Sequence, residues 1–275
     1  MHFSPVKQSS FYAKLHLLHN FSASNLKTIS TIKMCETDKN CLVIGISGAT
    51  CSGKTTLANA LHKVFPNSIS INQDRFYWPE DSPQHKIAEG VDHINWELVS
   101  AFDNSKLLKE INSHANQAGP VGARVNIHSD EIIRNFNALI QVLSEYSEHT
   151  KLPLEFERNE KLFKQLKTLF ASFPKLIIVD GILILNHPEV MKSCDLRFFA
   201  TLDYETCLER RNLRCYDPPD IPGYFEKIVY PYYITNLNDM KKLDIDKKIC
   251  YLDGSDDIVT NFKIIVNKIL DTITT

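Results

Sequence analysis

The apolar run Cys41-Leu-Val-Ile-Gly-Ile46 leads almost directly into Gly48-Ala-Thr-Cys-Ser-Gly53-Lys54-Thr55. A continuous apolar run of this length is typical of a strand that is buried on both faces of a parallel sheet. After the glycine-containing loop, four apolar residues recur with helical spacing: Leu57, Ala58, Leu61 and Val64. The stretch therefore predicts a buried strand, a tight loop and a helix in direct succession.

The eight residues from Gly48 match the pattern G-x-x-x-x-G-K-[ST], a phosphate-binding loop (P-loop). In this motif the backbone N–H groups of the loop and of the following helix bind phosphate oxygens. Lys54 reaches the β- and γ-phosphates, and the Thr55 hydroxyl ligates Mg²⁺. The sequence thus predicts a nucleoside triphosphate site, formed by Gly48, Ala49, Thr50, Cys51, Ser52, Gly53, Lys54, Thr55 and Thr56.

Further strand-like runs follow the P-loop at intervals along the chain. They are Ser68–Ile71, Leu176–Val179, Leu196–Thr201 and Lys248–Leu252. Apolar residues with helical spacing follow the last run, from Ile258 to Ile269. Strands that alternate with helices predict an α/β protein with right-handed crossovers. We expect the three-layer P-loop NTPase fold, with a central parallel sheet, a helical lid and a helical insert.

Two segments outside the α/β pattern, one before the first strand and one in the middle of the chain, indicate how the chain is organised. Up to Cys35 there are four lysines, no acidic residue and many serines and threonines. A mitochondrial presequence is also acid-poor, but it is usually rich in arginine, and this segment has none. We expect residues 1–39 to be a disordered extension and residues 40–275 to be one domain. Helical periodicity between about 118 and 173 predicts an insert in that domain.

Composition narrows the range of partners and compartments. The 275 residues are 43% apolar and 23% charged, with 31 basic and 33 acidic side chains. This balance argues against a nucleic-acid partner or a polybasic membrane protein, which need a positive field. No run of 18 apolar residues occurs, so we expect no membrane span. Seven cysteines without a C-x-x-C pair predict free thiols in a reducing compartment, which we expect to be the cytoplasm. We also expect the protein to be a monomer.

Acidic and basic residues beyond the P-loop favour a small kinase over other nucleotide-binding proteins. A GTPase would need the base-reading motif N-K-x-D, which the chain lacks. Asp74 follows the second strand and can accept a hydroxyl proton or hold the metal, because ligands bind at the carboxyl ends of such strands. Asp180 ends the third strand, as a metal-binding Walker-B acid does. Arg210, Arg211 and Arg214 are predicted to lie at one helix end, as a lid that clamps phosphates.

Several motifs together resemble one kinase family. They are Tyr216-Asp-Pro-Pro-Asp-Ile-Pro-Gly-Tyr-Phe225, Tyr230-Pro231, Tyr251-Leu-Asp-Gly254, Gly45-Ile-Ser-Gly48 and Gln73-Asp74. From about Cys41 to Ile269 the chain resembles the nicotinamide riboside kinases, a branch of the uridine-kinase-like P-loop kinases. The resemblance implies phosphorylation of the 5′-hydroxyl of nicotinamide riboside, and commonly of nicotinic acid riboside. ATP and Mg²⁺ are the implied phosphoryl donor and metal, and NAD salvage is the implied pathway.

The resemblance also assigns roles by position. Asp74 is implied to be the catalytic base, with Lys54 as the second catalytic residue. Arg210 and Arg214 fall on the ATP side. Three residues are implied to hold Mg²⁺: Thr55, Asp74 and Asp180. The implied substrate-binding residues are Asp74, Tyr77, Trp96, Glu97, Arg211, Tyr216, Asp217 and Asp220.

The chain departs from the family pattern at three places in or next to the implied site. Trp96-Glu97 replaces the usual Tyr-Asp pair, Arg75 stands where an acid is expected, and Asp180 replaces a common Glu. None of these changes removes a necessary group, but each bears on specificity. Two alternatives therefore remain: a uridine or cytidine kinase, and a non-catalytic P-loop protein that senses nucleotides. Because Lys54, Asp74 and the lid arginines are all present, the sequence favours an enzyme.

Overall fold

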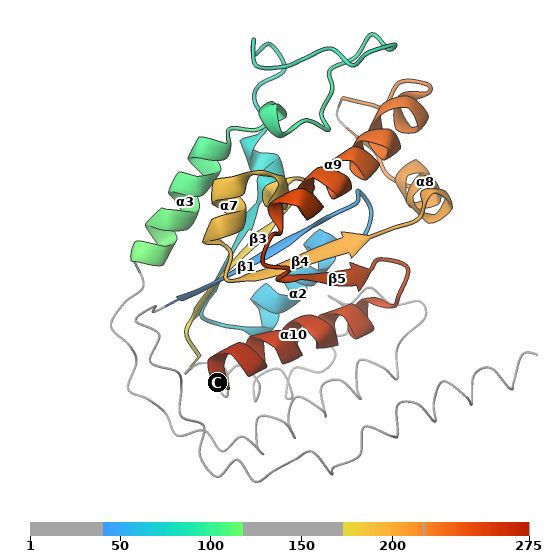
Figure 1. Cartoon of the computed structure of the whole chain (residues 1–275). Coiled ribbons are helices and arrows are strands. Elements are labelled where there is room, and N and C mark those ends of the chain that lie inside the picture. Colours follow the sequence, from blue (N-terminus) through green and yellow to red (C-terminus); the bar gives the residue numbers. More distant parts are fainter. Residues whose placement is uncertain (1–40, 118–172, 217, 275) are drawn as a thin grey trace, which may run out of the picture.

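A five-stranded parallel sheet forms the centre of the molecule (Figure 1). The computed structural model describes residues 41–117, 173–216 and 218–274. The strands stand in the order β2-β3-β1-β4-β5, and all four neighbouring pairs are parallel. Their bounds are β1 Cys41–Gly48, β2 Ser68–Asn72, β3 Lys175–Asp180, β4 Leu196–Thr201 and β5 Ile249–Asp253.

The register brings chemically active residues to one edge of this sheet. Asp180, the last residue of β3, stands opposite Ile46 of β1 and Asn72 of β2. Gly48, the last residue of β1, stands opposite Ala200 of β4. The P-loop begins at this point, so its residues and the acids that follow β2 and end β3 share the carboxyl edge, where α/β sheets bind ligands.

Helices cover both faces of the sheet and complete three layers (Figure 1). On one face lie α2 (Lys54–Val64) and α10 (Ile258–Thr274), whose apolar residues pack against alternate β1 residues Leu42, Ile44 and Ile46. On the other face lie α3 (Asn104–Asn116), α7 (Pro188–Ser193) and α9 (Tyr230–Leu243). Side chains of a parallel strand alternate between faces, which is why β1 is apolar throughout.

The remaining helical elements are short. Helix α8 spans Tyr204–Asn212, and a π-helical turn at Phe225–Val229 runs directly into α9. Single 3₁₀ turns occupy Gln73–Phe76, Val99–Ala101 and Ile184–Asn186.

The predicted fold class and all five predicted strands are confirmed, with shifts of one or two residues at their ends. One helical assignment is wrong, because α8 ends at Asn212 and Arg214 lies beyond it. There the Arg214 N–H donates to the Arg211 carbonyl, at 3.0 Å, and the chain turns. The extension at 1–39 and the insert at 118–172 lie outside the described residues. In the part of the chain that the structure describes, no helix has the length and apolarity to cross a bilayer.

Candidate active site

Two glycines give the P-loop its shape. Gly48 has a φ of +132°, and a Cβ there would lie 2.1 Å from the Ala200 carbonyl oxygen, so no other residue fits beside β4. Gly53 has a φ of +90° immediately before α2. Inside the loop the Ala49 carbonyl accepts hydrogen bonds from the Ser52 hydroxyl, at 2.8 Å, and from the Lys54 ammonium. The Lys54 side chain is therefore held across the loop that the motif predicts to bind phosphate.

Lys54 lies among the acids that the sequence placed at the sheet edge. Burial lowers the pKa of Lys54, while the carboxylates of Asp180 and Asp74 raise it. Asp180 is itself buried, and one of its oxygens accepts from the Thr55 hydroxyl at 2.7 Å and from the Asn72 amide at 2.9 Å. Burial raises the pKa of Asp180, and these two hydrogen bonds and Lys54 oppose the rise. The loop, β2 and β3 thus contribute to one polar cluster.

Asp74 stands at the start of the 3₁₀ turn that follows β2. Its N–H donates to the Asn72 side chain at 2.7 Å, which caps the turn. The side chain is exposed, yet desolvation by the surrounding protein raises its pKa, and Lys54 and Arg214 lower it.

The neighbouring Gln73 explains why Gly181 follows Asp180. The Gln73 side chain is buried and accepts from the Leu183 N–H at 3.0 Å. A Cβ at position 181 would lie 2.3 Å from the Gln73 Cβ, so only glycine lets the two strand ends approach this closely. Sequence reasoning noted the Gln73-Asp74 pair but did not predict this contact.

The oxygen ligands gathered here suit Mg²⁺. Thr55, Asp180 and Asp74 offer a hydroxyl and two carboxylates, and Mg²⁺ prefers oxygen. Among residues 41–117, 173–216 and 218–274, no group of three or more His, Cys, Asp or Glu side chains could hold a metal by itself. Mg²⁺ at nucleotide sites usually takes only one or two protein carboxylates, with phosphates and water completing the shell, so the residues fit this metal.

The three lid arginines occupy different places. Arg211 is buried and pairs bidentately with Asp220, at 2.6 and 2.8 Å, while its third nitrogen donates to the Thr50 hydroxyl at 3.3 Å. Its guanidinium carbon lies 4.2 Å from the centre of the Tyr216 ring. Arg210 donates to two backbone carbonyls, of Cys51 at 3.3 Å and Gly254 at 2.8 Å.

This network links the lid to the P-loop. Both Asp220 oxygens bind Arg211, so Asp220 orients that arginine. Tyr216 also approaches the loop directly, since its hydroxyl lies 3.5 Å from the Cys51 sulfur. Asp217, a predicted substrate residue, lies outside the described residues.

Three of the predicted nucleoside residues, Tyr77, Trp96 and Glu97, form an aromatic and acidic patch. Trp96 packs edge-on against Tyr77, with ring centres 5.3 Å apart, and against His85, at 4.7 Å. Glu97 is 7% exposed. Burial raises the pKa of Glu97 to about 7, although Arg211 and Lys54 lower it. A carboxyl group that titrates near neutrality therefore lies within the electrostatic reach of the lid and the P-loop.

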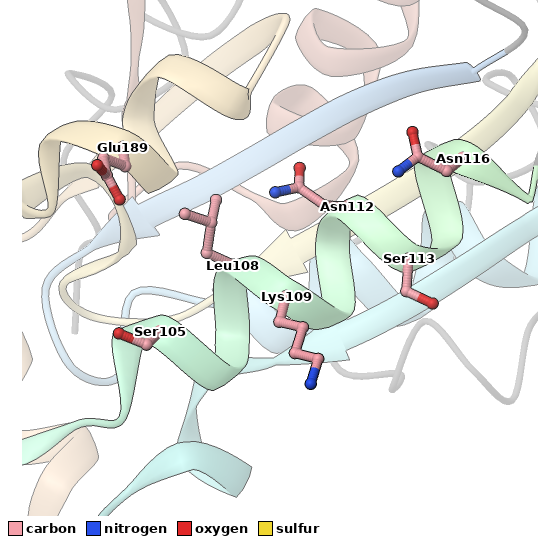
Figure 2. Close-up of a pocket in the computed structure, with 7 residues that line it drawn as sticks. All are labelled: Ser105, Leu108, Lys109, Asn112, Ser113, Asn116 and Glu189. Atoms are coloured by element: carbon pink, nitrogen blue, oxygen red, sulfur yellow. The ribbon is translucent and has the colours of Figure 1, made fainter.

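A separate surface depression of about 470 Å³ lies on α3 and α7 (Figure 2). Figure 2 shows six of its residues spaced along α3, with Glu189 on α7. They are Ser105, Leu108, Lys109, Asn112, Ser113 and Asn116. None of these residues belongs to the cluster around Lys54, so the depression is not the site described above.

Sequence reasoning missed two residues that shape the site: Asn72, which binds Asp180, and His85, which packs on Trp96. It placed Thr50 in the P-loop but did not predict its hydrogen bond to Arg211. Asn72 could have been found as the polar residue that ends a strand next to Asp74. The Thr50–Arg211 bond joins residues 161 positions apart, whereas His85 and Trp96 lie in the irregular segment between β2 and α3; no local pattern points to either contact.

No protein-family model matches the chain. Nicotinamide riboside kinase 1 of Homo sapiens is 28% identical over 213 residues, which cover 78% of this chain and 84% of that protein. Nicotinamide riboside kinase 2 of Mus musculus is 28% identical over 214 residues, covering 78% and 87%. The nicotinamide riboside kinase of Schizosaccharomyces pombe is 25% identical over 202 residues, covering 70% and 77%.

A possible uridine kinase from Bacillus stearothermophilus covers 87% of this chain and 95% of its own, with 14% identity and a TM-score of 0.37. The sequence relatives confirm the resemblance to nicotinamide riboside kinases that the motifs predicted.

Proposed function

We propose that this chain is an ATP-dependent kinase that phosphorylates the 5′-hydroxyl of nicotinamide riboside, and of nicotinic acid riboside, in NAD salvage. The observation that carries this proposal is the P-loop, with Lys54 held across it and Thr55 hydrogen-bonded to Asp180, at the same end of the sheet as Asp74 in the turn after β2. The names of the curated relatives support the substrate class. The chain contains a P-loop, a candidate general base and a candidate arginine-bearing lid, the three parts that phosphoryl transfer to a small acceptor needs.

In this proposal Asp74 is the general base. The acceptor oxygen attacks the γ-phosphorus, its proton passes to the Asp74 carboxylate, and the bond to the leaving ADP oxygen breaks. Desolvation raises the pKa of Asp74 and so its basicity, while Lys54 and Arg214 favour its ionised form.

Lys54 and Arg214 are cationic groups that stabilise the negative charge on the transferring phosphoryl group. Thr55, Asp180 and Asp74 would hold Mg²⁺, which neutralises phosphate charge when it is bound. Arg210 bridges the P-loop and Gly254 and would help to shape the ATP side of the site.

The nucleoside would bind between the aromatic cluster and the lid. Trp96, Tyr77 and Tyr216 offer ring faces or edges, and a cationic pyridinium is attracted to aromatic faces. Glu97 and Arg211 are the acceptor and donor that suit ribose hydroxyls. Asp220 then acts through Arg211, because both of its oxygens are engaged there.

Two other functions make different predictions for the same assay. A uridine or cytidine kinase would phosphorylate a neutral nucleoside at least as well as the cationic riboside. A nucleotide sensor would bind ATP without transferring its phosphate. The free thiols of Cys51, Cys194, Cys207, Cys215 and Cys250 support a reducing compartment, and we assign the protein to the cytoplasm.

The test is to incubate the purified chain with ATP, Mg²⁺ and either nicotinamide riboside or uridine, and to follow the products by mass spectrometry. We expect equimolar ADP and riboside monophosphate. The 5′-deoxy analogue of the riboside should give no product, because it lacks the attacking oxygen. A product from uridine alone would refute the proposal in favour of a pyrimidine-nucleoside kinase, and ATP binding without product from either nucleoside would refute it in favour of a sensor.

A further inference from the structure

The backbone that carries Trp96 and Glu97 is held by side chains from a distant segment. The Tyr224 hydroxyl accepts a hydrogen bond from the Trp96 N–H and donates one to the Ile94 carbonyl, each at 3.1 Å. On the other side of Trp96, the Asn236 amide donates to the Glu97 carbonyl at 2.9 Å. Two residues from the region that follows the lid therefore bind three peptide groups in a four-residue stretch.

Tyr224 is built into the core. It is 1% exposed, and its ring centre lies 4.8 Å from that of His93. Burial raises its pKa, so the phenol stays neutral and keeps both its donor and its acceptor functions. The same pKa responds to the charges of Glu97, Arg211 and Asp220, so the hydroxyl lies within electrostatic reach of the nucleoside patch.

Asn236, the second residue that holds this backbone stretch, is itself held by a hydrogen bond. Asn236 lies on α9, and its own carbonyl accepts from the Asn186 side chain at 2.7 Å. The Glu97 N–H is also paired, since it donates to the Asn95 side chain at 3.1 Å. Both backbone polar groups of Glu97 are thus satisfied, and its position depends on α9 and on the turn at Ile184–Asn186.

We propose that Tyr224 is a positioning residue for the riboside, acting through the backbone of residues 94–97. This inference rests on the proposed function. The Tyr224 hydroxyl bonds to the backbone of Ile94 and Trp96, not to the P-loop or Asp74, so its effect should fall on riboside binding. Removing its hydroxyl leaves the Trp96 N–H and the Ile94 carbonyl without a partner in a region with little water, and such groups relax towards solvent.

A second buried tyrosine provides the matched control. Tyr233 is 9% exposed, and its hydroxyl accepts from the Leu202 N–H at 3.3 Å. Its hydroxyl therefore binds a backbone group as that of Tyr224 does, but the group lies at the end of β4. Tyr224→Phe and Tyr233→Phe each delete one buried hydroxyl, so a general loss of stability should appear in both.

The kinetic test measures both variants at equal folded fraction. For Tyr224→Phe we expect the KM for nicotinamide riboside to rise at least fivefold, with kcat and the KM for ATP within twofold of wild type. Tyr233→Phe should leave all three constants within twofold. Asn236→Ala, which removes the other anchor, should raise the riboside KM in the same direction.

Hydrogen exchange tests the same role without activity. The Trp96 amide is bonded to a buried hydroxyl, so peptides that contain it should exchange faster in Tyr224→Phe and not in Tyr233→Phe. Two results would overturn the inference, provided that the wild type is active. In one, the Tyr224→Phe variant keeps its riboside KM within twofold of wild type; in the other, its Trp96 amide exchanges at the wild-type rate. A wild type that does not phosphorylate the riboside would refute the proposed function instead, whatever the exchange shows.

Discussion

Replacing Glu97 by glutamine should change the pH dependence of riboside use. The Glu97 side chain is 7% exposed, and burial raises its pKa from 4.5 to about 7, with Arg211 and Lys54 opposing and Asp220 and Asp74 adding to the rise. With this pKa, the ionised fraction climbs from roughly 10% at pH 6 to roughly 90% at pH 8. The carboxylate is the form that attracts a pyridinium and accepts ribose hydroxyls.

The wild-type kcat/KM for nicotinamide riboside should therefore rise by about tenfold between pH 6 and pH 8 through this group. Glu97→Gln keeps the size of the side chain but cannot ionise, so its profile should lack that rise. Any contribution from Asp74 is common to both proteins, and the ratio of the two profiles isolates Glu97. Identical profiles would show that Glu97 does not bind the riboside as a carboxylate.

Ionisation of Glu97, which should favour riboside binding, should lower the free energy of unfolding. Because the folded pKa lies above the unfolded value of 4.5, the ionised group disfavours the fold; the penalty begins above pH 4.5 and is complete above about pH 7. A rise of the Glu97 pKa from 4.5 to about 7 corresponds to about 3 kcal/mol in the free energy of unfolding. Urea unfolding should therefore find Glu97→Gln more stable than wild type at pH 8, with a gain that shrinks towards pH 5. A variant less stable than wild type at pH 8 would refute the reasoning.

Three further changes test the base, the aromatic patch and the extension. Asp74→Asn should lower kcat at least ~100-fold, as loss of a general base does, while calorimetry still detects ATP binding; more than a third of wild-type kcat would exclude that role. Trp96→Leu should reduce the preference for nicotinamide riboside over uridine, because a cation over an aromatic face is favoured by about 0.5–2 kcal/mol. An unchanged ratio at equal folded fraction would mean that Trp96 only packs the core. A chain that begins at Met34 keeps all of β1 and should match the full chain in kcat and Tm, whereas a loss of either would show that residues 1–33 support the domain.

The strands and the P-loop were predictable because their signals are local. A parallel strand covered on both faces is apolar where it is buried: β1 is apolar from Cys41 to Ile46, β3 from Leu176 to Val179, and β4 from Phe198 to Ala200. Helices α3, α7 and α9 were not predicted. Only Asn104, Leu107 and Ile111 are buried on α3, and α7 has six residues. Helix α9 follows a π-helical turn and has a proline as its second residue.

The acids of the candidate site were predictable for a related reason. Asp74 follows a strand and Asp180 ends one, and topology alone brings the carboxyl ends of parallel strands together. The pairing of Arg211 with Asp220 and the contact of Tyr224 with Trp96 depend on how loops fold back over the sheet. Such contacts join residues that are 9 and 128 positions apart, and no residue pattern along the chain encodes them.

Direct competition between two nucleosides tests the central claim. The wild-type chain would receive ATP, Mg²⁺ and an equimolar mixture of nicotinamide riboside and uridine, and the ratio of the two monophosphates at early times gives the ratio of their kcat/KM values. The aromatic patch and the Glu97 carboxylate both favour the cationic ring, so we expect the riboside product to exceed the uridine product by about tenfold or more. Equal amounts, or an excess of uridine monophosphate, would contradict the assignment.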